Sequence, residues 1–390
     1  MQKNYKRLGD YIQPVVGRNN TLGDLPLVGL SIQKKFIPSI ANTIGTDMST
    51  YKIIEKNQFA YGPVTSRNGE KITIALFSDY EKALISQAYI PFEVKDTKEL
   101  NPEYLMMWFC RHEFDRYARF KSHGSAREIF DWEEMCNVML PIPSIEKQRE
   151  IVEEYNTIQN RINLNQNLIQ KLEATAQAIY KEWFVDGIDL EHLPDGWRIG
   201  TIGDYAKVKS GFAFKSEWWQ LDGVPVIKIG SINNNTIDTN MLDHVSSNII
   251  DKAKNYIVKK ADIVIAMTGA TIGKFGLIPE LNSTILVNQR VGMFDLGNNP
   301  IEKVPFLYIN LLNDSIQNEI INVGGDSAQA NISNGQIESI EMIYPHKELI
   351  ENFNRSCYPF FELILNKINE NQKLMEMKDL LLSKLASVEK

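Results

Sequence analysis

Two long segments of the chain carry apolar residues at the spacing of packed α-helices. In the first, steps of four and three residues alternate for more than four heptads. A seam this narrow predicts a helix that packs against one other helix, whereas a helix on a globular core usually carries a wider apolar stripe. The seam positions are Ile151, Tyr155, Ile158, Ile162, Asn165, Ile169, Leu172, Ala176, Ile179 and Trp183.

The second segment runs roughly from Glu348 to Ser387 and has a broader stripe, which includes Phe360, Ile364, Leu374 and Leu381. The economical partner of each helix is the other one. Antiparallel packing of the two would create a pseudo-two-fold axis near Asn165. At ~1.5 Å per residue the first seam is ~48 Å long, which corresponds to about 14 base pairs of duplex at ~3.4 Å each.

The remaining sequence has short apolar runs separated by Gly, Pro and Asn, a pattern typical of strands and turns. Strands are predicted at Leu27–Ile32, Ile72–Phe77, Val224–Ile229 and Ala261–Met267, and turns at Asp195-Gly196 and Asn334-Gly335. Each mixed region ends at a proline, Pro143 or Pro345, before a long helix begins.

The two halves of the chain are similar to each other. A shift of 202 residues places Pro143 on Pro345, Ile162 on Ile364, and Gln170-Lys171-Leu172 on Gln372-Lys373-Leu374. Near the start of each half the shift is 194, which matches Leu8-Gly9-Asp10-Tyr11 with Ile202-Gly203-Asp204-Tyr205. The sequence therefore predicts a tandem repeat whose second copy carries about eight extra residues.

The predicted fold class is α/β, of the α+β kind. Two similar globular domains are separated by two long helices, which pack as an antiparallel intramolecular coiled coil with pseudo-two-fold symmetry. The expected boundaries are 1–143 for the first globular domain, 144–187 for the central helix, 188–345 for the second globular domain and 346–390 for the C-terminal helix.

Composition indicates a soluble cytoplasmic protein. Of the 390 residues, 43% are apolar and 23% are charged. The three cysteines show no disulfide or zinc-ligand spacing, and we expect neither a signal peptide nor a membrane span. The formal charge of −7 excludes a uniformly basic nucleic-acid coat. Residues 1–143 nevertheless carry 18 basic and 17 acidic side chains, so the net charge does not exclude a local basic groove.

No catalytic, metal-binding or cofactor-binding motif is complete. The segment Gly269–Phe275 has three residues between its first glycine and the next, and it ends in Phe where a phosphate-binding loop needs Ser or Thr. The segment Asn101-Pro102-Glu103-Tyr104 only partly matches the Asn-Pro-Pro-Tyr loop of amino-methyltransferases. We therefore expect no catalytic residue, no metal and no cofactor in this chain.

Three motifs resemble those of the specificity subunit of type I restriction–modification systems. The segment Pro141–Ile151 is similar to the start of that family's conserved central helix. The segment Leu193–Trp197 is similar to the start of its second target-recognition domain, and Ser210–Ser216 to a segment that recurs in such domains. The first globule lacks the last of these motifs and has Val16-Gly17-Arg18-Asn19 near its place.

The resemblance implies a non-catalytic subunit whose two target-recognition domains each read one half of a bipartite, asymmetric site in double-stranded DNA. The helices would fix the spacer between the half-sites and dock two methyltransferase subunits, which hold S-adenosylmethionine. A restriction subunit, with motor and nuclease activities, would join through them. A coiled-coil scaffold that binds only proteins is the alternative, and a third possibility is the targeting part of a longer restriction–methylation enzyme.

Direct reading of bases needs side chains such as Arg, Lys, Asn and Gln on loops or strand ends, with glycine allowing the backbone to come close to phosphate. In the first globule the predicted DNA contacts are Arg18, Asn19, Thr65, Ser66, Arg67, Asn68, Gln87, His123, Ser125 and Arg127. In the second they are Lys209, Ser210, Phe212, Lys215, Thr268, Thr271, Lys274, Asn288, Gln289, Arg290, Gln329 and Asn331. The pair Trp218-Trp219 could stack on a base, but a buried core pair is the favoured interpretation.

Overall fold

The computed structural model describes residues 5–20, 22–39, 45–66, 69, 71–124, 127–325 and 330–387. The chain forms two compact units. Unit 1 is Met1–Asn160 with Met375–Lys390, and unit 2 is Arg161–Leu374. This division cuts both long helices, so the four-part boundaries expected from the sequence stay a prediction. Within the described residues, no helix has the length and apolar character needed to cross a membrane.

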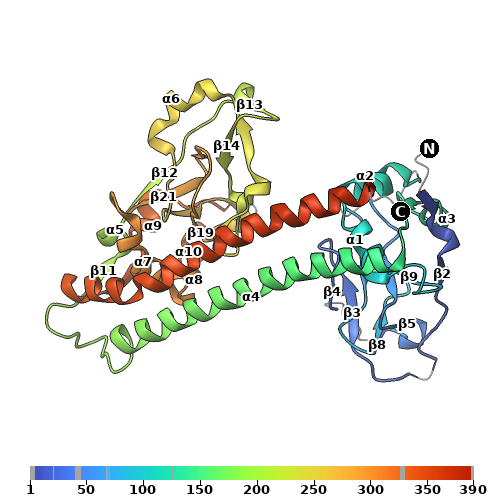
Figure 1. The fold of residues 1–390 in the computed structure, drawn as a ribbon. Coiled ribbons are helices and arrows are strands. Elements are labelled where there is room, and N and C mark those ends of the chain that lie inside the picture. The colour runs from blue at the N-terminus through green and yellow to red at the C-terminus, as the bar shows by residue number, and fades with distance from the viewer. Residues whose placement is uncertain are drawn as a thin grey trace. The chain divides into compact units, whose positions relative to one another are not determined.

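The two long helices form as expected. They are α4 (Ile145–Phe184) and α10 (Lys347–Lys384), drawn in green and red in Figure 1. The Ser144 hydroxyl accepts from Lys147 N at 3.4 Å at the start of α4. After α4 ends, Gly187 turns the chain with a φ of 74°. Helix α10 continues through Pro359, a residue that interrupts most helices because it lacks an N–H donor.

The helices pack against each other in both units. In unit 2, Arg161 lies 2.5 Å from Glu370, and more than 20 residues along α4 the ring of Phe184 lies 5.2 Å from that of Phe353. Residue numbers thus rise along α4 while they fall along α10. The predicted antiparallel helix pair is confirmed in this unit.

In unit 1 the same antiparallel order holds. Lys378 Nζ donates to Gln159 Oε1 at 2.6 Å, and Ile151 belongs to the same hydrophobic core as Leu385. The seam positions that were predicted from spacing are buried or half-buried in the described helices, namely Ile151, Tyr155, Ile158, Ile162, Asn165, Ile169, Leu172, Ala176, Ile179, Trp183, Phe360, Ile364, Leu374 and Leu381.

Unit 1 contains a mixed α/β globule. Its sheets have the orders β1-β10, β2-β9-β6-β7 and β4-β3-β8-β5. The strands are β1 (Tyr5–Arg7), β2 (Ile12–Pro14), β3 (Leu27–Leu30), β4 (Phe36–Pro38), β5 (Lys52–Glu55), β6 (Phe59–Tyr61), β7 (Ile74–Leu76), β8 (Lys82–Ile85), β9 (Ile90–Val94) and β10 (Met139–Pro141). The helices are α1 (Pro102–Phe109), α2 (His112–Lys121) and α3 (Trp132–Cys136).

Unit 2 contains the second globule, with sheets β11-β22, β12-β21-β18-β19-β16-β15 and β13-β17-β14-β20. The strands are β11 (Arg198–Thr201), β12 (Lys207–Ser210), β13 (Trp219–Gln220), β14 (Val224–Ile227), β15 (Ile232–Asn233), β16 (Thr236–Ile237), β17 (Asp243–Val245), β18 (Ile263–Ala266), β19 (Phe275–Leu277), β20 (Leu286–Val287), β21 (Val291–Asp295) and β22 (Glu341–Tyr344). The helices are α5 (Ile202–Tyr205), α6 (Ile250–Ala253), α7 (Val304–Leu311), α8 (Asp314–Gly324) and α9 (Asn334–Glu338). In Figure 1, β13, β14 and α6 lie on the side of this unit away from α10.

The globules repeat each other at the level of strand register. Tyr5 of β1 pairs with Pro141 of β10. A shift of 194 residues takes Tyr5 to Ile199, and a shift of 202 takes Pro141 to Ile343. These two residues pair between β11 and β22. The parallel pair Leu27–Leu84 likewise has its counterpart in Val226–Leu286. Because register is maintained through separate sheets, the tandem repeat predicted from the sequence is confirmed.

One local prediction was wrong. Asn334-Gly335 does not form a turn but begins α9, because the Ser333 hydroxyl and the Gln336 side chain form a capping box there. The residues after Asn101 form the two helices α1 and α2. At the start of α1, the Asn101 side chain caps the helix by accepting from Glu103 N and Tyr104 N, which gives the partial methyltransferase motif a structural role.

Candidate nucleic-acid interface

Backbone hydrogen bonds bring four separate segments of unit 2 together beyond the ends of β12, β18 and β21. Gln289 N donates to Phe212 O at 2.9 Å, and Met267 N donates to Arg290 O at 3.0 Å. A third hydrogen bond, from Gly269 N to Ala330 O, is 2.8 Å long. Each of the four segments contains predicted DNA contacts. The fold therefore gathers residues that lie more than 100 positions apart in the sequence into one loop surface.

Gly211 is required for this convergence. A Cβ atom at this position would lie 2.4 Å from the backbone oxygens of both Val287 and Asn288, closer than atoms can approach. The sequence predicted that glycine lets backbone come close to phosphate. In the structure, Gly211 lets two segments of the protein backbone come close to each other, and an approach to phosphate stays a prediction.

The exposed polar and charged side chains of this loop surface include those of Lys274, Gln289, Arg290 and Asn331. Within the described part of the chain, neither Lys274 nor Arg290 has a carboxylate partner. Their charges are therefore available to a ligand. Asn331 belongs to the same surface because it forms an isolated β-bridge with Thr268.

Other predicted contacts in unit 2 stabilise the loops. The Thr271 hydroxyl donates to Thr268 O at 3.1 Å, and Asn288 Oδ1 accepts from Arg290 N at 3.1 Å. The Ser210 hydroxyl donates to Asn334 Oδ1 at 2.8 Å. These side chains shape the surface from within, since each is half-buried. Gln329 lies outside the described residues.

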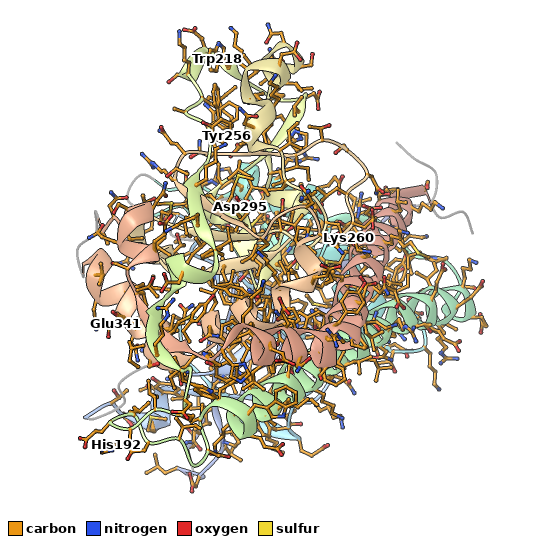
Figure 2. All side chains as sticks on the ribbon, turned by 90° about the vertical axis from the view of Figure 1, so that its left-hand side faces the viewer. His192, Trp218, Tyr256, Lys260, Asp295 and Glu341 are labelled. Atoms are coloured by element: carbon orange, nitrogen blue, oxygen red, sulfur yellow. The ribbon has the colours of Figure 1, made fainter. Side chains whose placement is uncertain are left out.

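A cluster of aromatic rings with lysines over them lies next to the loops. Phe212 stacks on Trp218 with 6.2 Å between ring centroids, and Figure 2 labels Trp218 near Tyr256. Lys209 lies 4.5 Å from the Tyr256 ring, and Lys215 lies 5.4 Å from the Trp218 ring. Trp218 and Trp219 are half-buried against a small hydrophobic core, in agreement with the favoured core interpretation. Sequence reasoning missed Tyr256, because no short motif connects it with Lys209.

Unit 1 has a loop pair at the corresponding place. Phe130 N donates to Pro63 O at 2.8 Å, and Thr65 N donates to Glu128 O at 3.0 Å. The segment after Gly62 thus lies alongside the segment from Ser122 to Phe130, which contains His123 and Arg127. Ser66, His123 and Arg127 are exposed, whereas Thr65 is only 2% exposed.

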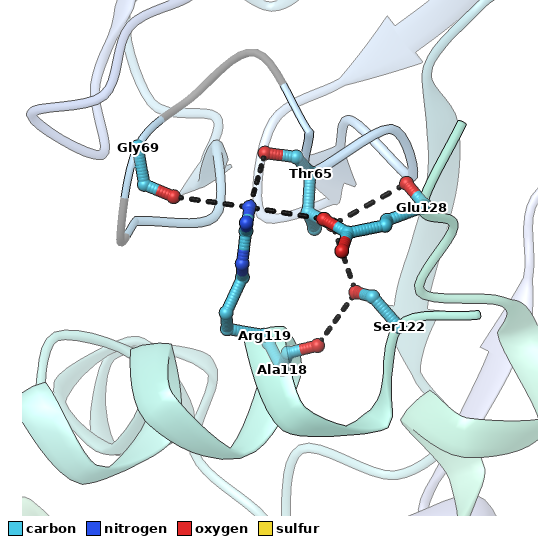
Figure 3. A network of polar contacts seen from close by, with 6 residues as sticks. All are labelled: Thr65, Gly69, Ala118, Arg119, Ser122 and Glu128. Carbon is cyan, nitrogen blue, oxygen red and sulfur yellow. Dashed lines mark hydrogen bonds and ion pairs between the residues drawn. The ribbon is translucent and has the colours of Figure 1, made fainter. Parts of the chain in front are cut away.

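A polar network holds this loop pair together (Figure 3). The Thr65 hydroxyl lies 2.9 Å from the Ser122 hydroxyl, and Arg119 Nη1 donates to Thr65 O and Gly69 O, each at 3.3 Å. The Arg119 guanidinium also lies 3.1 Å from the Glu128 carboxylate. Sequence reasoning missed Arg119 and Glu128, because nothing in their spacing connects them with Thr65.

The other predicted contacts of unit 1 lie elsewhere in the globule. The backbone of Arg18 forms an isolated antiparallel β-bridge with that of Lys52. Burial and the positive charge of Arg18 lower the pKa of Lys52. Asn19 is 1% exposed, and its amide bonds to the backbone of Gly23, so it offers no group to a ligand. Gln87 is exposed in the loop between β8 and β9. Arg67, Asn68 and Ser125 lie outside the described residues.

The described residues contain no group of three or more His, Cys, Asp or Glu side chains able to hold a metal ion. The arrangement on these surfaces is one of cationic and amide side chains on loops, which suits recognition of phosphates and base edges.

Comparison with protein families gives one matching description, "Type I restriction modification DNA specificity domain". It matches residues 3–174 and again residues 194–351, once in each half of the chain. The double match follows the repeat that the strand registers show.

Similar proteins carry related names. The HindI specificity subunit of a type I restriction enzyme from Haemophilus influenzae is 22% identical, over 92% of both chains. The MjaVIII specificity subunit from Methanocaldococcus jannaschii is 21% identical, over 76% of this chain and 72% of that protein. The crystal structure of a type I restriction–modification S subunit from M. genitalium has the same fold, with a TM-score of 0.54 and 15% identity over 99% of this chain and 96% of that one.

Proposed function

The chain belongs to the type I restriction modification DNA specificity family, and on that premise we propose that it is the sequence-specificity subunit of such a complex. Each unit reads one half of a bipartite DNA site, and the helix pair of α4 and α10 sets the spacer between the halves. The chain itself carries out no chemical step. A cytoplasmic location is part of the same proposal.

The observation that carries this proposal is the duplicated loop pair. Thr65 N bonds to Glu128 O in unit 1, and Gly269 N bonds to Ala330 O at the corresponding place in unit 2. Each pair presents exposed polar or basic side chains, and the side chains differ between the units. One scaffold that displays two different loop surfaces is what recognition of an asymmetric site requires.

Electrostatics favours selective over general DNA binding. Arg18 and Arg127 in unit 1, like Lys274 and Arg290 in unit 2, have no carboxylate partner among the described residues. The chain as a whole nevertheless carries a net charge of −7. Few phosphate contacts mean weak binding to arbitrary DNA, so base contacts decide which sites are bound.

We further propose that two methyltransferase subunits bind the helix pair and that these subunits hold S-adenosylmethionine. A restriction subunit would join through them. The long helices are the natural docking element, because they carry exposed residues such as Leu164 and Leu380 outside the seam.

The proposal is tested by producing the full chain together with a type I methyltransferase subunit, in a host without adenine methylation, and mapping every modified adenine. We expect one bipartite motif with an unread spacer. The methyltransferase without this chain is the control and should leave the motif unmodified. A protein-only scaffold, the alternative function, would give no sequence-dependent modification in either sample, and that result would refute the proposal.

A further inference from the structure

The two units lock equivalent loop pairs with different side-chain chemistry. In both units the backbone bonds between the loops are the same, with N to O distances of 3.0 Å from Thr65 to Glu128 and 2.8 Å from Gly269 to Ala330. Among the described residues of the two units, only those of unit 1 add the polar network of Figure 3 to these bonds. We call Thr65, Arg119, Ser122 and Glu128 the polar clamp.

Unit 2 has no polar side chain at the four positions that correspond to the clamp. The shift of 202 residues places Arg119 on Ile321, Ser122 on Gly324 and Glu128 on Ala330, while the backbone bonds place Thr65 on Gly269. None of these four unit 2 residues has a side chain that can donate or accept a hydrogen bond. The polar clamp is therefore a feature of unit 1 and not of the fold that the two units share.

An apolar side chain fills the same region in unit 2. A Cβ atom added to Gly324 would lie 2.9 Å from Ile272 Cδ1, so Ile272 lies where the side chain of Ser122 begins in unit 1. Ile272 is 8% exposed and belongs to a hydrophobic core with Ile320 and Ile332. Burial of Ile272, together with the hydrogen bond from Gln317 Nε2 to Gly273 O at 3.3 Å, thus supports the loop pair that the polar clamp supports in unit 1.

Arg119 is the centre of the clamp. Its Nη1 donates to the backbone oxygens of Thr65 and Gly69, and its guanidinium pairs with Glu128 on the opposite loop. Arg119 comes from α2, so the helix fixes both loops with one side chain. A planar guanidinium suits this task better than an ammonium, because its donors point in several fixed directions.

We propose that Arg119, assisted by Ser122, is a positioning residue that determines how strictly unit 1 reads its half-site, whereas unit 2 depends on Ile272 for the same purpose. This inference rests on the proposed function. The exposed residues that the clamp positions are Ser66 on one loop and His123 and Arg127 on the other. Loops free to shift would accept more base pairs at the same position, since base contacts depend on fixed geometry.

The test compares the methylation motif of the wild-type complex with that of Arg119→Ala. We expect discrimination against mismatched base pairs in one half-site to fall about tenfold, with the other half-site and the spacer unchanged. Arg119→Lys should recover part of this discrimination. Arg116→Ala is the matched control on the same helix, because the Arg116 side chain is 76% exposed and lies 3.7 Å from Glu113. It should leave both half-sites unchanged.

Ser122→Ala provides a second, milder variant in case Arg119→Ala prevents folding. It removes one bond to Thr65 and should relax the same half-site to a smaller extent. Unchanged motifs in both variants would overturn the inference, and so would equal relaxation of both half-sites, which indicates a general structural role. The proposed function fails separately, since in that case the wild-type complex itself would show no bipartite motif.

Discussion

At the scale of single residues, the loop surfaces consist of exposed side chains that are free to contact DNA and half-buried ones that hold the loops. Arg290 and Asn288 show the two roles side by side, since Asn288 Oδ1 accepts from the backbone N of Arg290 while the Arg290 side chain stays exposed. The sequence predicted polar and basic residues on these loops, and their contacts with DNA stay a prediction. It could not tell which of these side chains are exposed and which hold the loops, because burial depends on neighbours from distant segments.

Arg290→Ala should weaken base discrimination at one position. Arginine donates two hydrogen bonds to guanine, and loss of such a contact costs about 1–3 kcal/mol. We expect the methylation motif to become degenerate at one base pair of one half-site, and this half-site should differ from the one that Arg119→Ala affects. Lys260→Ala is the control, because Lys260 pairs with Glu280 at 3.4 Å and lies before β18. An unchanged motif in the Arg290 variant would remove this residue from the base-reading set.

Asp262→Asn should stabilise unit 2 at neutral pH. Burial raises the pKa of Asp262 from 3.8 to about 6. The folded state therefore binds a proton more tightly than the unfolded state, and the contribution of this group to stability falls as pH rises from about 4 through about 6. The amide can still accept from Lys259 N, which is 2.8 Å from the carboxylate.

We expect the Asp262→Asn variant to exceed the wild type by about 2 kcal/mol in unfolding free energy at pH 7, with a difference that shrinks below pH 4. Chemical denaturation at both pH values measures this. Asp251→Asn, at an exposed position on α6, is the control. A difference that does not change with pH would show that the titration of Asp262 is not its cause.

At the scale of elements, a polar layer interrupts the apolar seam between α4 and α10. Asn165 Nδ2 donates to Asn371 Oδ1 at 2.9 Å, and both residues are buried. Glu370 lies beside this pair, and hydrogen bonds from Arg161 and Lys367 lower its pKa to about 2. A buried amide pair costs little while both partners are present, and it disfavours shifted registers in which one of them meets an apolar side chain.

Asn165→Leu should destabilise the helix pair by about 1–3 kcal/mol, because it leaves the Asn371 amide buried without its partner. The double variant Asn165→Leu with Asn371→Leu should regain most of that stability, while its methylation motif should tolerate more than one spacer length. Thermal unfolding and motif mapping check the two effects. Gln166→Leu makes the same chemical change at an exposed position and serves as control. A double variant less stable than the single one would contradict this account.

The long elements were more predictable than the short ones. The heptad seam predicted α4 correctly because its period repeats many times and one partner buries it. Asn334-Gly335 was misread as a turn, since the capping box of Ser333 and Gln336 outweighed the local turn preference. The polar clamp could not be predicted, because Thr65, Arg119 and Glu128 meet only after three separate segments have folded.

At the scale of the whole molecule, the repeat explains why one chain carries two units with similar loop pairs. Strand registers such as Tyr5–Pro141 and Ile199–Ile343 correspond across the halves, although the loop side chains differ. The repeat was readable from the sequence because core positions and helix spacings are constrained in both copies. The bases that each loop pair would read under the proposed function could not be predicted from the sequence, because recognition depends on the exact placement of exposed side chains.

The most direct test of the account is the spacer length of the methylation motif after one heptad is inserted in each helix, behind Ile162 in α4 and behind Gln372 in α10. Paired insertion preserves the antiparallel register, and seven residues add about 10 Å, or roughly three base pairs. We predict a spacer longer by about that amount, with both half-sites unchanged. An unchanged spacer, or altered half-sites, would contradict the claim that two independent readers are held apart by these helices.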